Sequence, residues 1–331
     1  MKTLIRLFVL LLLLVAAGGG YLWFLLNRPY QGYSEARILD FPHGTSTVQI
    51  AELLQGAGVI RSARLFQISR YLSPGAALQA GEYKFDKPLS TLDVFRKIAR
   101  GETFYLELVV PEGNTMFDIA ETIRGLKIFP AERFLEAARN PKLIADLDPK
   151  APSLEGYLFP DTYRVNRQTT AEGLCRTMTH RFREMWRKLD TQADVHDTVT
   201  LASLVEREAH LPSDRPLIAS VFRNRLSLDM KLDCDPTTVY AALLEGRYRG
   251  TIHRSDLESN SPYNTYKHPG LPPGPIANPG IGSIKASLNP ADTDFLFFVA
   301  KADGSGGHTF SRDIAGHTAA VQDYHRNLQQ K

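Results

Sequence analysis

The feature that most constrains this chain is an uncharged run close to its N-terminus. Residues 7–26 read LFVLLLLLVAAGGGYLWFLL, and apart from three glycines every residue of the run is apolar. At about 1.5 Å of rise per residue, a helix of this length reaches about 30 Å, which is the thickness of the hydrocarbon core of a membrane. The run therefore predicts a membrane-spanning helix.

A cleaved signal peptide is the alternative interpretation of this run. Signal peptides have a shorter apolar region, of about 7–15 residues, that ends at small residues. Small residues do occur at 16–19, but the apolar sequence resumes at Tyr21, which favours a retained anchor. Because Lys2 and Arg6 precede the run, we expect a single-pass membrane protein whose N-terminus is cytoplasmic and whose body lies outside the cytoplasm.

The excess of basic over acidic residues in this chain lies entirely in residues 1–28. The formal net charge is +3, and residues 1–28 contain three basic residues and no acidic one. Residues 29–331 therefore carry equal numbers of basic and acidic side chains. Since nucleic-acid-binding proteins concentrate basic residues on one surface, this balance argues against a nucleic acid as a partner.

The two cysteines, Cys175 and Cys234, are the only ones in the chain. In an oxidising compartment they could form a disulfide, but two unpaired thiols are favoured, because a core of this size does not need a covalent link. The spacings of Cys and His match no metal-binding motif, and no His-Glu-x-x-His or Gly-x-Ser-x-Gly motif occurs. We therefore expect neither a metal ion nor a cofactor.

Two short segments of the N-terminal half resemble each other. Residues 42–51 and 111–120 share Pro, Gly, Ile and Ala at matching positions, and each lies between an apolar run and a helical pattern. This arrangement predicts a strand, a turn and a helix, with Ser46 or Thr47 and Asn114 or Thr115 as N-caps. The second segment resembles the start of a LysM module, a small glycan-binding fold. A generic strand–turn–helix without affinity for sugars is the alternative.

A polar, proline-bearing stretch at 141–153 separates these small units from the rest of the chain. We predict an α+β protein in three parts. Residues 1–28 form a cytoplasmic stub and a transmembrane helix, residues 29–145 form a LysM-like α+β region, and residues 146–331 form a larger α+β domain. A Gly-rich turn at 304–307 predicts a hairpin in this last part.

A carboxylate on an apolar helix face is the strongest chemical signal in the larger domain. The pattern of residues 198–209 predicts a helix, and Leu201, Leu204, Val205 and Glu208 lie on one stripe of it. Burial and the negative end of the helix dipole both raise the pKa of a carboxyl group at this position. A protonated glutamate can act as the general acid that glycosidic cleavage requires.

A structural role is the alternative for Glu208, because glutamates on buried stripes are often paired. Glu206 lies about 200° away around the helix and points elsewhere, which predicts a nearby arginine as its partner. Further along, the segment 260–266 combines amides, hydroxyls and aromatic rings, and residues 270–280 are too rich in Pro and Gly for a helix or a central strand. These two segments suit a sugar-binding cleft, with a packed structural loop as the alternative.

Several motifs occur in one order that resembles the endolytic murein transglycosylases, the YceG-like family. They are the segment Leu201–Glu208, Asp235-Pro236-Thr237, Tyr263-Asn264-Thr265-Tyr266 and the loop at 270–280. The resemblance implies that Glu208 is catalytic. It also implies that Tyr263, Asn264 and Tyr266 position the sugar, with Asp235 and Thr237 as weaker candidates. Cys234 departs from the small hydroxyl residue expected beside Asp235.

The implied activity is that of a lyase. A lytic transglycosylase cleaves the β-1,4 bond between N-acetylmuramic acid and N-acetylglucosamine within peptidoglycan strands and leaves 1,6-anhydro ends, without a cofactor. Such an enzyme would control glycan length in cell-wall assembly, and cell-wall synthases would be its partners. Two alternatives stay open: a lysozyme-like muramidase that uses Asp235 as a second acid, and a non-catalytic, membrane-tethered peptidoglycan-binding protein.

Overall fold

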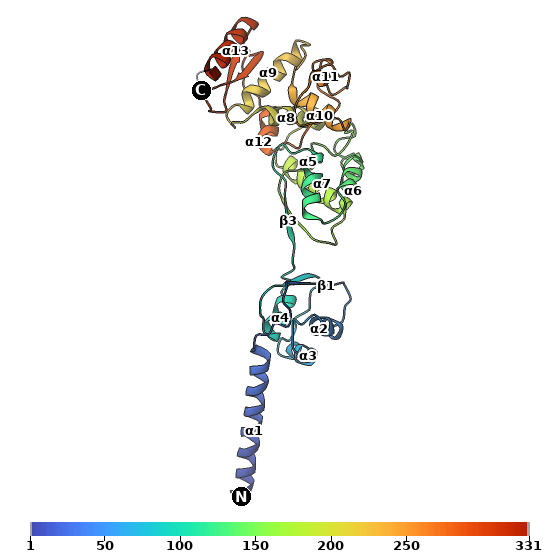
Figure 1. Cartoon of the computed structure of the whole chain (residues 1–331), viewed down its shortest axis with the longest axis vertical. Coiled ribbons are helices and arrows are strands. Elements are labelled where there is room, and N and C mark those ends of the chain that lie inside the picture. Colours follow the sequence, from blue (N-terminus) through green and yellow to red (C-terminus); the bar gives the residue numbers. More distant parts are fainter. Residues whose placement is uncertain (1, 330–331) are drawn as a thin grey trace. The chain divides into compact units, whose positions relative to one another are not determined.

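The computed structural model describes residues 2–329 (Figure 1). Chain contacts divide it into two compact units, of which the first ends at Leu106 and the second begins at Glu107. Both units mix helices and strands, so the predicted α+β class is confirmed. The division differs from the predicted boundary at residue 145, because it assigns the second strand–turn–helix segment to the larger unit.

The first unit contains one long helix and a small α+β module. Its two strands, β1 and β2, pair antiparallel with Leu39 opposite Tyr83. The elements are α1 (Lys2–Asn27), β1 (Arg37–Phe41), α2 (Thr47–Gly56), α3 (Ala63–Tyr71), β2 (Gly81–Phe85) and α4 (Thr91–Ala99).

Helix α1 contains the predicted spanning run. By length and composition it is able to cross a membrane, and the side chains of its apolar run are almost all exposed. Only Leu26, close to its C-terminal end, is buried. An exposed apolar helix of this length is consistent with a membrane anchor or with a signal sequence.

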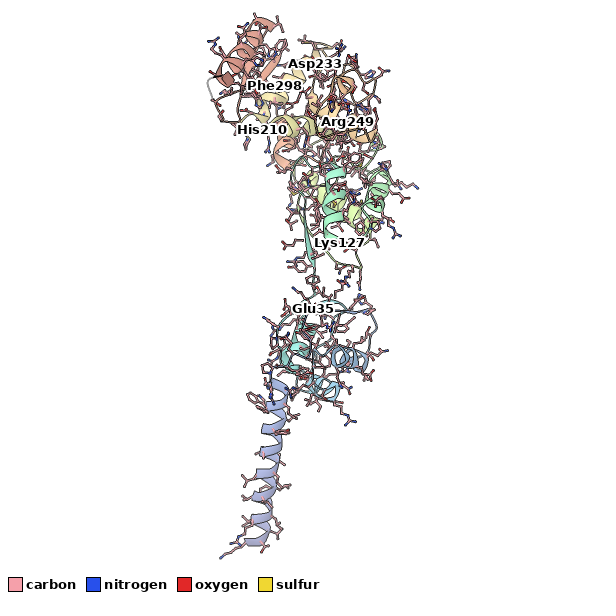
Figure 2. All side chains as sticks on the ribbon, in the orientation of Figure 1. Glu35, Lys127, His210, Asp233, Arg249 and Phe298 are labelled. Atoms are coloured by element: carbon pink, nitrogen blue, oxygen red, sulfur yellow. The ribbon has the colours of Figure 1, made fainter. Side chains whose placement is uncertain are left out.

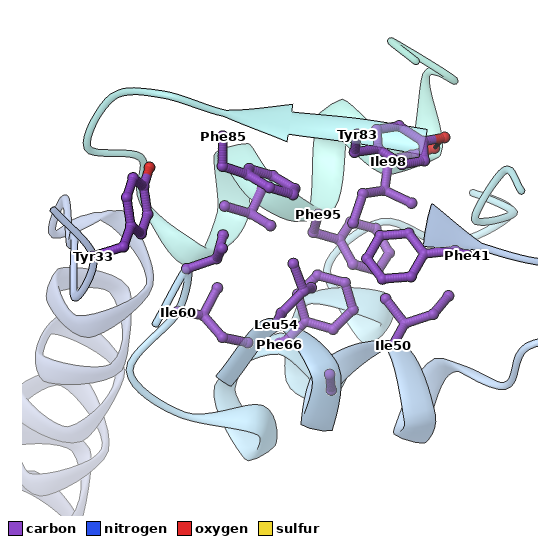
Figure 3. Close-up of a cluster of buried hydrophobic side chains, with 13 residues drawn as sticks. Tyr33, Phe41, Ile50, Leu54, Ile60, Phe66, Tyr83, Phe85, Phe95 and Ile98 are labelled. Carbon is purple, nitrogen blue, oxygen red and sulfur yellow. Dashed lines mark hydrogen bonds between the residues drawn. The ribbon is translucent and has the colours of Figure 1, made fainter. Parts of the chain in front are cut away.

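The module of the first unit has an aromatic core (Figure 3). Phe41 of β1 lies against Tyr83 of β2, with ring centroids 5.6 Å apart. Phe66 of α3 and Phe95 of α4 form a second pair with centroids 5.4 Å apart. These rings fill the space between the two-stranded sheet and the helices, so the module has a hydrophobic core of its own.

The second unit is mainly helical and contains two more strand pairs, β3 with β4 and the antiparallel hairpin of β5 with β6. The hairpin lies where the Gly-rich turn predicted it. The elements are β3 (Leu106–Val109), α5 (Met116–Leu126), α6 (Ala131–Ala138), the 3₁₀-helix η1 (Pro141–Leu143), β4 (Thr162–Val165), α7 (Ala171–Arg187), α8 (Val195–Glu208), α9 (Arg215–Ser227), α10 (Asp235–Leu244), α11 (Arg254–Leu257), α12 (Ile281–Leu288), β5 (Phe297–Ala300), β6 (His308–Ser311) and α13 (Ile314–Gln329).

Helix α8 is central to the second unit. It packs against α9, α12 and α10 (Figure 1). Its residues Leu204 and Val205 are fully buried in a cluster with Phe222 of α9, Tyr240 of α10 and Ile276 of the Pro/Gly-rich loop. The end of α8 is therefore held by three neighbouring helices and a loop, which gives its last residue a fixed position.

Hydrogen bonds explain why the second strand–turn–helix segment belongs to the larger unit. The N–H of Val110 donates to the carbonyl of Asp161 at 3.0 Å, next to the paired strands β3 and β4. The N–H of Gly113 donates to the carbonyl of Asn278 at 2.9 Å. The second segment therefore belongs to the larger unit, because its hydrogen bonds reach residues of that unit far along the chain. The N-cap predictions are confirmed as Ser46 for α2 and Thr115 for α5.

Candidate active site

Glu208 is the last residue of α8, at the end of the predicted apolar stripe. Leu201, Leu204 and Val205 are buried, and Glu208 is partly buried one turn further on. The next residue, Ala209, has extended backbone angles and ends the helix. The predicted stripe is thus confirmed, and the carboxyl group of Glu208 lies where the apolar face of α8 ends.

The surroundings of Glu208 raise the pKa of its carboxyl group above the ordinary value, and burial is the main cause. The negative charge of Asp235 acts in the same direction. The thiol of Cys234, which donates a hydrogen bond, and the positive charges of Arg207 and His210 act in the opposite direction. The net effect favours a protonated glutamic acid, the form that can donate a proton to a leaving group.

Cys234 is the direct partner of Glu208. Its Sγ lies 3.2 Å from Oε1 of Glu208 and donates a hydrogen bond to it, although 26 residues separate the two in sequence. Cys234 is the N-cap residue of α10, so the start of this helix is brought to the end of α8. The labels of His210, two residues after Glu208, and of Asp233, directly before Cys234, locate these two segments in Figure 2. This contact was not predicted from the sequence, where Cys234 was considered as a possible disulfide partner and as a departure from the pattern beside Asp235.

Asp235 and Tyr266 form an accessible polar pair beside this contact. Asp235 is exposed, Tyr266 is partly buried, and the Tyr266 hydroxyl donates to Oδ1 of Asp235 at 2.8 Å. Burial and the hydrogen bond to Asp235 raise the pKa of Tyr266, so the phenol stays protonated. Of the five predicted sugar-binding residues, these two have the most accessible side chains.

Thr237 lies in the same turn but is fully buried. Its Oγ1 donates to the carbonyl of Cys234 at 2.6 Å and lies 3.0 Å from Oγ1 of Thr265. The same Thr265 oxygen accepts the N–H of Cys234 at 3.0 Å. The two hydroxyl groups therefore fix the backbone of Cys234 from both sides, and Thr237 has no surface left for a ligand.

Asn264 is also fully buried, and its amide is fully used inside the loop. Its Nδ2 donates to the carbonyls of Leu257 at 3.0 Å and Ser259 at 2.7 Å, and its Oδ1 accepts the N–H of Tyr266 at 3.0 Å. Asn264 thus shapes the loop that carries Tyr266. Direct contact with a sugar, as expected from the sequence, is not open to it in this structure.

Tyr263 is a core residue. Its ring lies 5.1 Å from that of Tyr240, and only 8% of the residue is exposed. Burial raises the pKa of its hydroxyl group. Tyr263, Thr237 and Asn264 are therefore buried residues that hold the loops of the site in place. Asp235 and Tyr266 are its accessible residues.

The Pro/Gly-rich loop at 270–280 is packed onto α8. Its Ile276 N–H donates to Oγ of Ser203 at 3.0 Å, and its Gly280 N–H donates to Oε2 of Glu206 at 2.9 Å. A Cβ atom on Gly280 would meet the carboxylate of Glu112, so a larger residue there would require the Glu112 side chain to shift. The structure therefore supports the packed-loop alternative for most of this segment.

Glu206 has the structural role predicted for it. Its Oε1 lies 3.2 Å from Nη2 of Arg215, and the same guanidinium group lies 3.3 Å from Oε2 of Glu112. The prediction of an arginine partner is confirmed. Since Glu206 and Glu208 point to different surroundings, only Glu208 is available at the end of the helix.

A second buried carboxyl group, Glu155, was not singled out from the sequence. Its two oxygens accept the N–H of Met116 at 3.1 and 3.0 Å, and Oε1 also accepts Nδ2 of Asn278 at 2.7 Å. Burial raises the pKa of Glu155 to about 8. Glu155 is almost completely inaccessible, so it joins segments of the unit and does not face a ligand.

Asn278 is the other member of this network. Its Oδ1 accepts the N–H groups of Gly156 at 2.8 Å and Leu158 at 2.9 Å, and its Nδ2 also donates to the carbonyl of Asn114 at 2.9 Å. One amide therefore ties together three segments that are far apart in sequence. An asparagine within a Pro/Gly-rich loop was the one available signal.

The cysteines are both buried free thiols, so the disulfide alternative is not formed in this structure. Cys175 lies on α7, and burial raises the pKa of its thiol to about 12. Within residues 2–329, no three side chains of His, Cys, Asp or Glu are arranged as a metal site.

The chain is similar to proteins of one family over most of its length. The profile of the YceG-like family matches residues 39–323. A protein from Bacillus subtilis (strain 168), named endolytic murein transglycosylase, is 34% identical over 307 residues, which cover 86% of this chain and 84% of the relative. A protein of the same name from Streptococcus pneumoniae serotype 2 (strain D39) is 31% identical over 295 residues, covering 79% of this chain and 54% of the relative.

A solved structure gives the same assignment. A YceG-like protein from Listeria monocytogenes is 32% identical and superposes with a TM-score of 0.55, over 87% of this chain and 99% of the other. The sequence profile, the named relatives and the solved structure agree, and together they confirm the resemblance drawn from the motifs. The chain belongs to the YceG-like family.

Proposed function

We propose that this protein is a lytic transglycosylase of peptidoglycan and that Glu208 is its catalytic acid and base. The observation that carries this proposal is the carboxyl group of Glu208, partly buried at the end of α8, with its pKa raised and an accessible Asp235–Tyr266 pair beside it. Support for the substrate comes from the relatives, which are named endolytic murein transglycosylases.

In the first step Glu208 acts as an acid. Its proton passes to the glycosidic oxygen as the β-1,4 bond between N-acetylmuramic acid and N-acetylglucosamine breaks, and the bonding electrons stay with the leaving oxygen. Burial raises the pKa of Glu208 and so favours the protonated form before the reaction. A carboxyl group with an ordinary pKa would already be ionised at neutral pH and would be a poorer acid here.

In the second step Glu208 acts as a base. The 6-hydroxyl of the muramoyl residue attacks its own anomeric carbon and gives its proton to the Glu208 carboxylate, which restores the starting enzyme. The product is a 1,6-anhydro end, and no water is consumed. One carboxyl group that acts first as an acid and then as a base is enough for these two steps, whereas common glycoside hydrolases use two carboxyl groups.

The remaining predicted residues divide into two groups. Asp235 and Tyr266, whose side chains are accessible, are proposed to contact the sugar. Tyr263, Asn264 and Thr237 are proposed to hold the loops that carry these contacts, since their polar atoms are used within the protein or buried.

The cellular setting follows from α1. We propose that α1 anchors the protein once in the inner membrane, with Lys2 on the cytoplasmic side and the second unit in the periplasm, where peptidoglycan lies. Cell-wall synthases are the expected partners, since an endolytic cut within new strands sets their length.

Glycan binding by the two strand–turn–helix segments remains a prediction. Their local structure is that of the predicted strand, turn and capped helix. The LysM-like assignment needs more than this local structure, because the same pattern is common in proteins that bind no sugar. Binding of the purified module to insoluble peptidoglycan would test it after the module has been shown to fold.

Mass spectrometry of digested peptidoglycan tests the proposed reaction. Full-length protein in detergent should produce new 1,6-anhydromuramoyl ends. New reducing ends without anhydro ends would identify a muramidase with Asp235 as a candidate second acid. No new ends of either kind would favour a binding protein.

A matched pair of variants tests the role of Glu208. Glu208→Gln keeps the shape of the side chain and removes the transferable proton, so we expect a rate loss of about 10²–10⁴-fold with unchanged folding. Glu172→Gln, which changes an exposed glutamate on α7, should keep full activity. Cleavage by Glu208→Gln at the wild-type rate would refute the assignment.

A further inference from the structure

The thiol of Cys234 contacts Glu208, although Cys234 occupies the N-cap position of α10. Cys234 is the N-cap of α10, where a side chain normally accepts a hydrogen bond from the first turn of the helix. Here the side chain makes no capping bond, and Sγ donates instead to Oε1 of Glu208 at 3.2 Å. The side chain is thus turned away from its own helix and toward the carboxyl group.

The backbone of Cys234 is held firmly in this position. Its N–H donates to Oγ1 of Thr265 at 3.0 Å, and its carbonyl accepts Oγ1 of Thr237 at 2.6 Å. With only 2% of the residue exposed, the thiol has little room to turn elsewhere. The contact with Glu208 is therefore set by the surrounding fold.

We propose that Cys234 is a positioning residue for Glu208, whose S–H binds Oε1 and leaves Oε2 as the oxygen that gives and takes the proton in the reaction. This inference rests on the proposed function of Glu208. It adds a residue that fixes the orientation of the carboxyl group and stabilises its charged form between the two steps.

The protonation states suit this role. Burial and the nearby carboxylate of Glu208 raise the pKa of the Cys234 thiol far above neutral, so it remains a donor. Four neighbouring groups influence the pKa of Glu208. They are Arg207 on α8, His210 after it, and Cys234 and Asp235 at the start of α10. Removal of Cys234 takes away one of the influences that favour the carboxylate and leaves the burial that favours the acid.

Kinetics over a range of pH test the proposal with three variants of the full-length protein. For Cys234→Ala we expect a loss of about tenfold in kcat with little change in KM, because one hydrogen bond to a charged group is removed. The basic limb of its kcat profile should move to higher pH, since Glu208 then keeps its proton longer. Cys234→Ser restores a donor and should recover most of the loss.

Cys175→Ala is the matched control, because Cys175 is the other buried free thiol and has no role in the proposed site. It should keep the wild-type kcat and pH profile. The inference is overturned if Cys234→Ala also keeps both, or if Cys175→Ala loses as much activity. Absence of anhydro products from the wild type would instead overturn the proposed function, so the two failures are distinguishable.

An infrared measurement tests the contact even if Cys234→Ala does not fold. A hydrogen-bonded S–H group absorbs at lower frequency than a free one, and Cys234→Ser identifies the band of Cys234. We expect Glu208→Ala to move that band to higher frequency and to leave the band of Cys175 in place. A Cys234 band that does not move would overturn the proposal.

Discussion

The two strand–turn–helix segments of this protein have the same local structure and different surroundings. In the first, β1 leads through Gly44 to α2, and the capping box of Ser46 is exposed. In the second, β3 leads through Gly113 to α5, and the N-cap Thr115 is buried. Both turn glycines have positive φ, which permits the same tight turn in each copy.

The second copy is tied to distant parts of its unit. The N–H of Gly113 donates to Asn278, and the N–H of Met116 donates to Glu155. The local sequence therefore specifies the turn and the cap in both copies. Long-range hydrogen bonds join the second copy to the unit that contains the candidate site. Three experiments test this difference between the two copies.

The largest effect is expected from Asn278→Ala. This change leaves the N–H groups of Gly156 and Leu158 without their partner in a buried site and removes the donor to Glu155, so we expect a loss of about 3 kcal/mol or more in the free energy of unfolding. Asn140→Ala, which removes an exposed side-chain contact with Lys142, should cost less than about 1 kcal/mol.

Tryptophan fluorescence during urea unfolding can report this loss. The chain has two tryptophans, and Trp186 is buried against Phe182 in the second unit. In a Trp23→Phe background, Trp186 reports on that unit alone. Equal midpoints for Asn278→Ala and Asn140→Ala would contradict the role assigned to Asn278.

The next effect is expected from pH, and for each pH unit it is smaller than the loss from Asn278→Ala. Burial raises the pKa of Glu155 from its ordinary value of 4.5 to about 8, so the folded state binds this proton more tightly than the unfolded state. Its contribution is fully present below pH 4.5 and is lost as the pH rises toward 8. The stability of the second unit should therefore fall across this range.

Glu155→Gln isolates this contribution, because it cannot ionise. We expect the variant to lose less stability between pH 5 and pH 8 than the wild type, by an amount of up to about 1.4 kcal/mol per pH unit. The first unit, which does not contain Glu155, should show the same pH dependence in both proteins. Identical slopes for the second unit would show that Glu155 does not titrate in this range.

The smallest effect is expected from the two caps themselves. Thr115→Ala should cost about 1–2 kcal/mol and Ser46→Ala about 0.5–1 kcal/mol, because the buried cap leaves its partners without access to water. Hydrogen exchange of the first turns of α5 and α2 measures the two losses separately. A greater loss in α2 than in α5 would contradict the contrast between the copies.

Features with a local cause could be predicted from the sequence. The caps Ser46 and Thr115 and the stripe that ends at Glu208 follow from preferences within one or two helical turns. The arginine partner of Glu206 was predicted because a partly buried carboxylate needs one. The contact between Cys234 and Glu208, and the burial of Asn264, were not predictable in this way.

The apolar N-terminal run, the charge balance of the rest of the chain, the family and the acidic residue at the end of α8 could therefore be recognised without a structure. The packing of distant segments was needed to show which polar residues of the candidate site are accessible and which are buried and hold its loops in place. Asn278, for example, joins backbone groups up to 164 residues away. Periodicity and capping act over a few residues, whereas such contacts depend on how the packed core brings distant segments together.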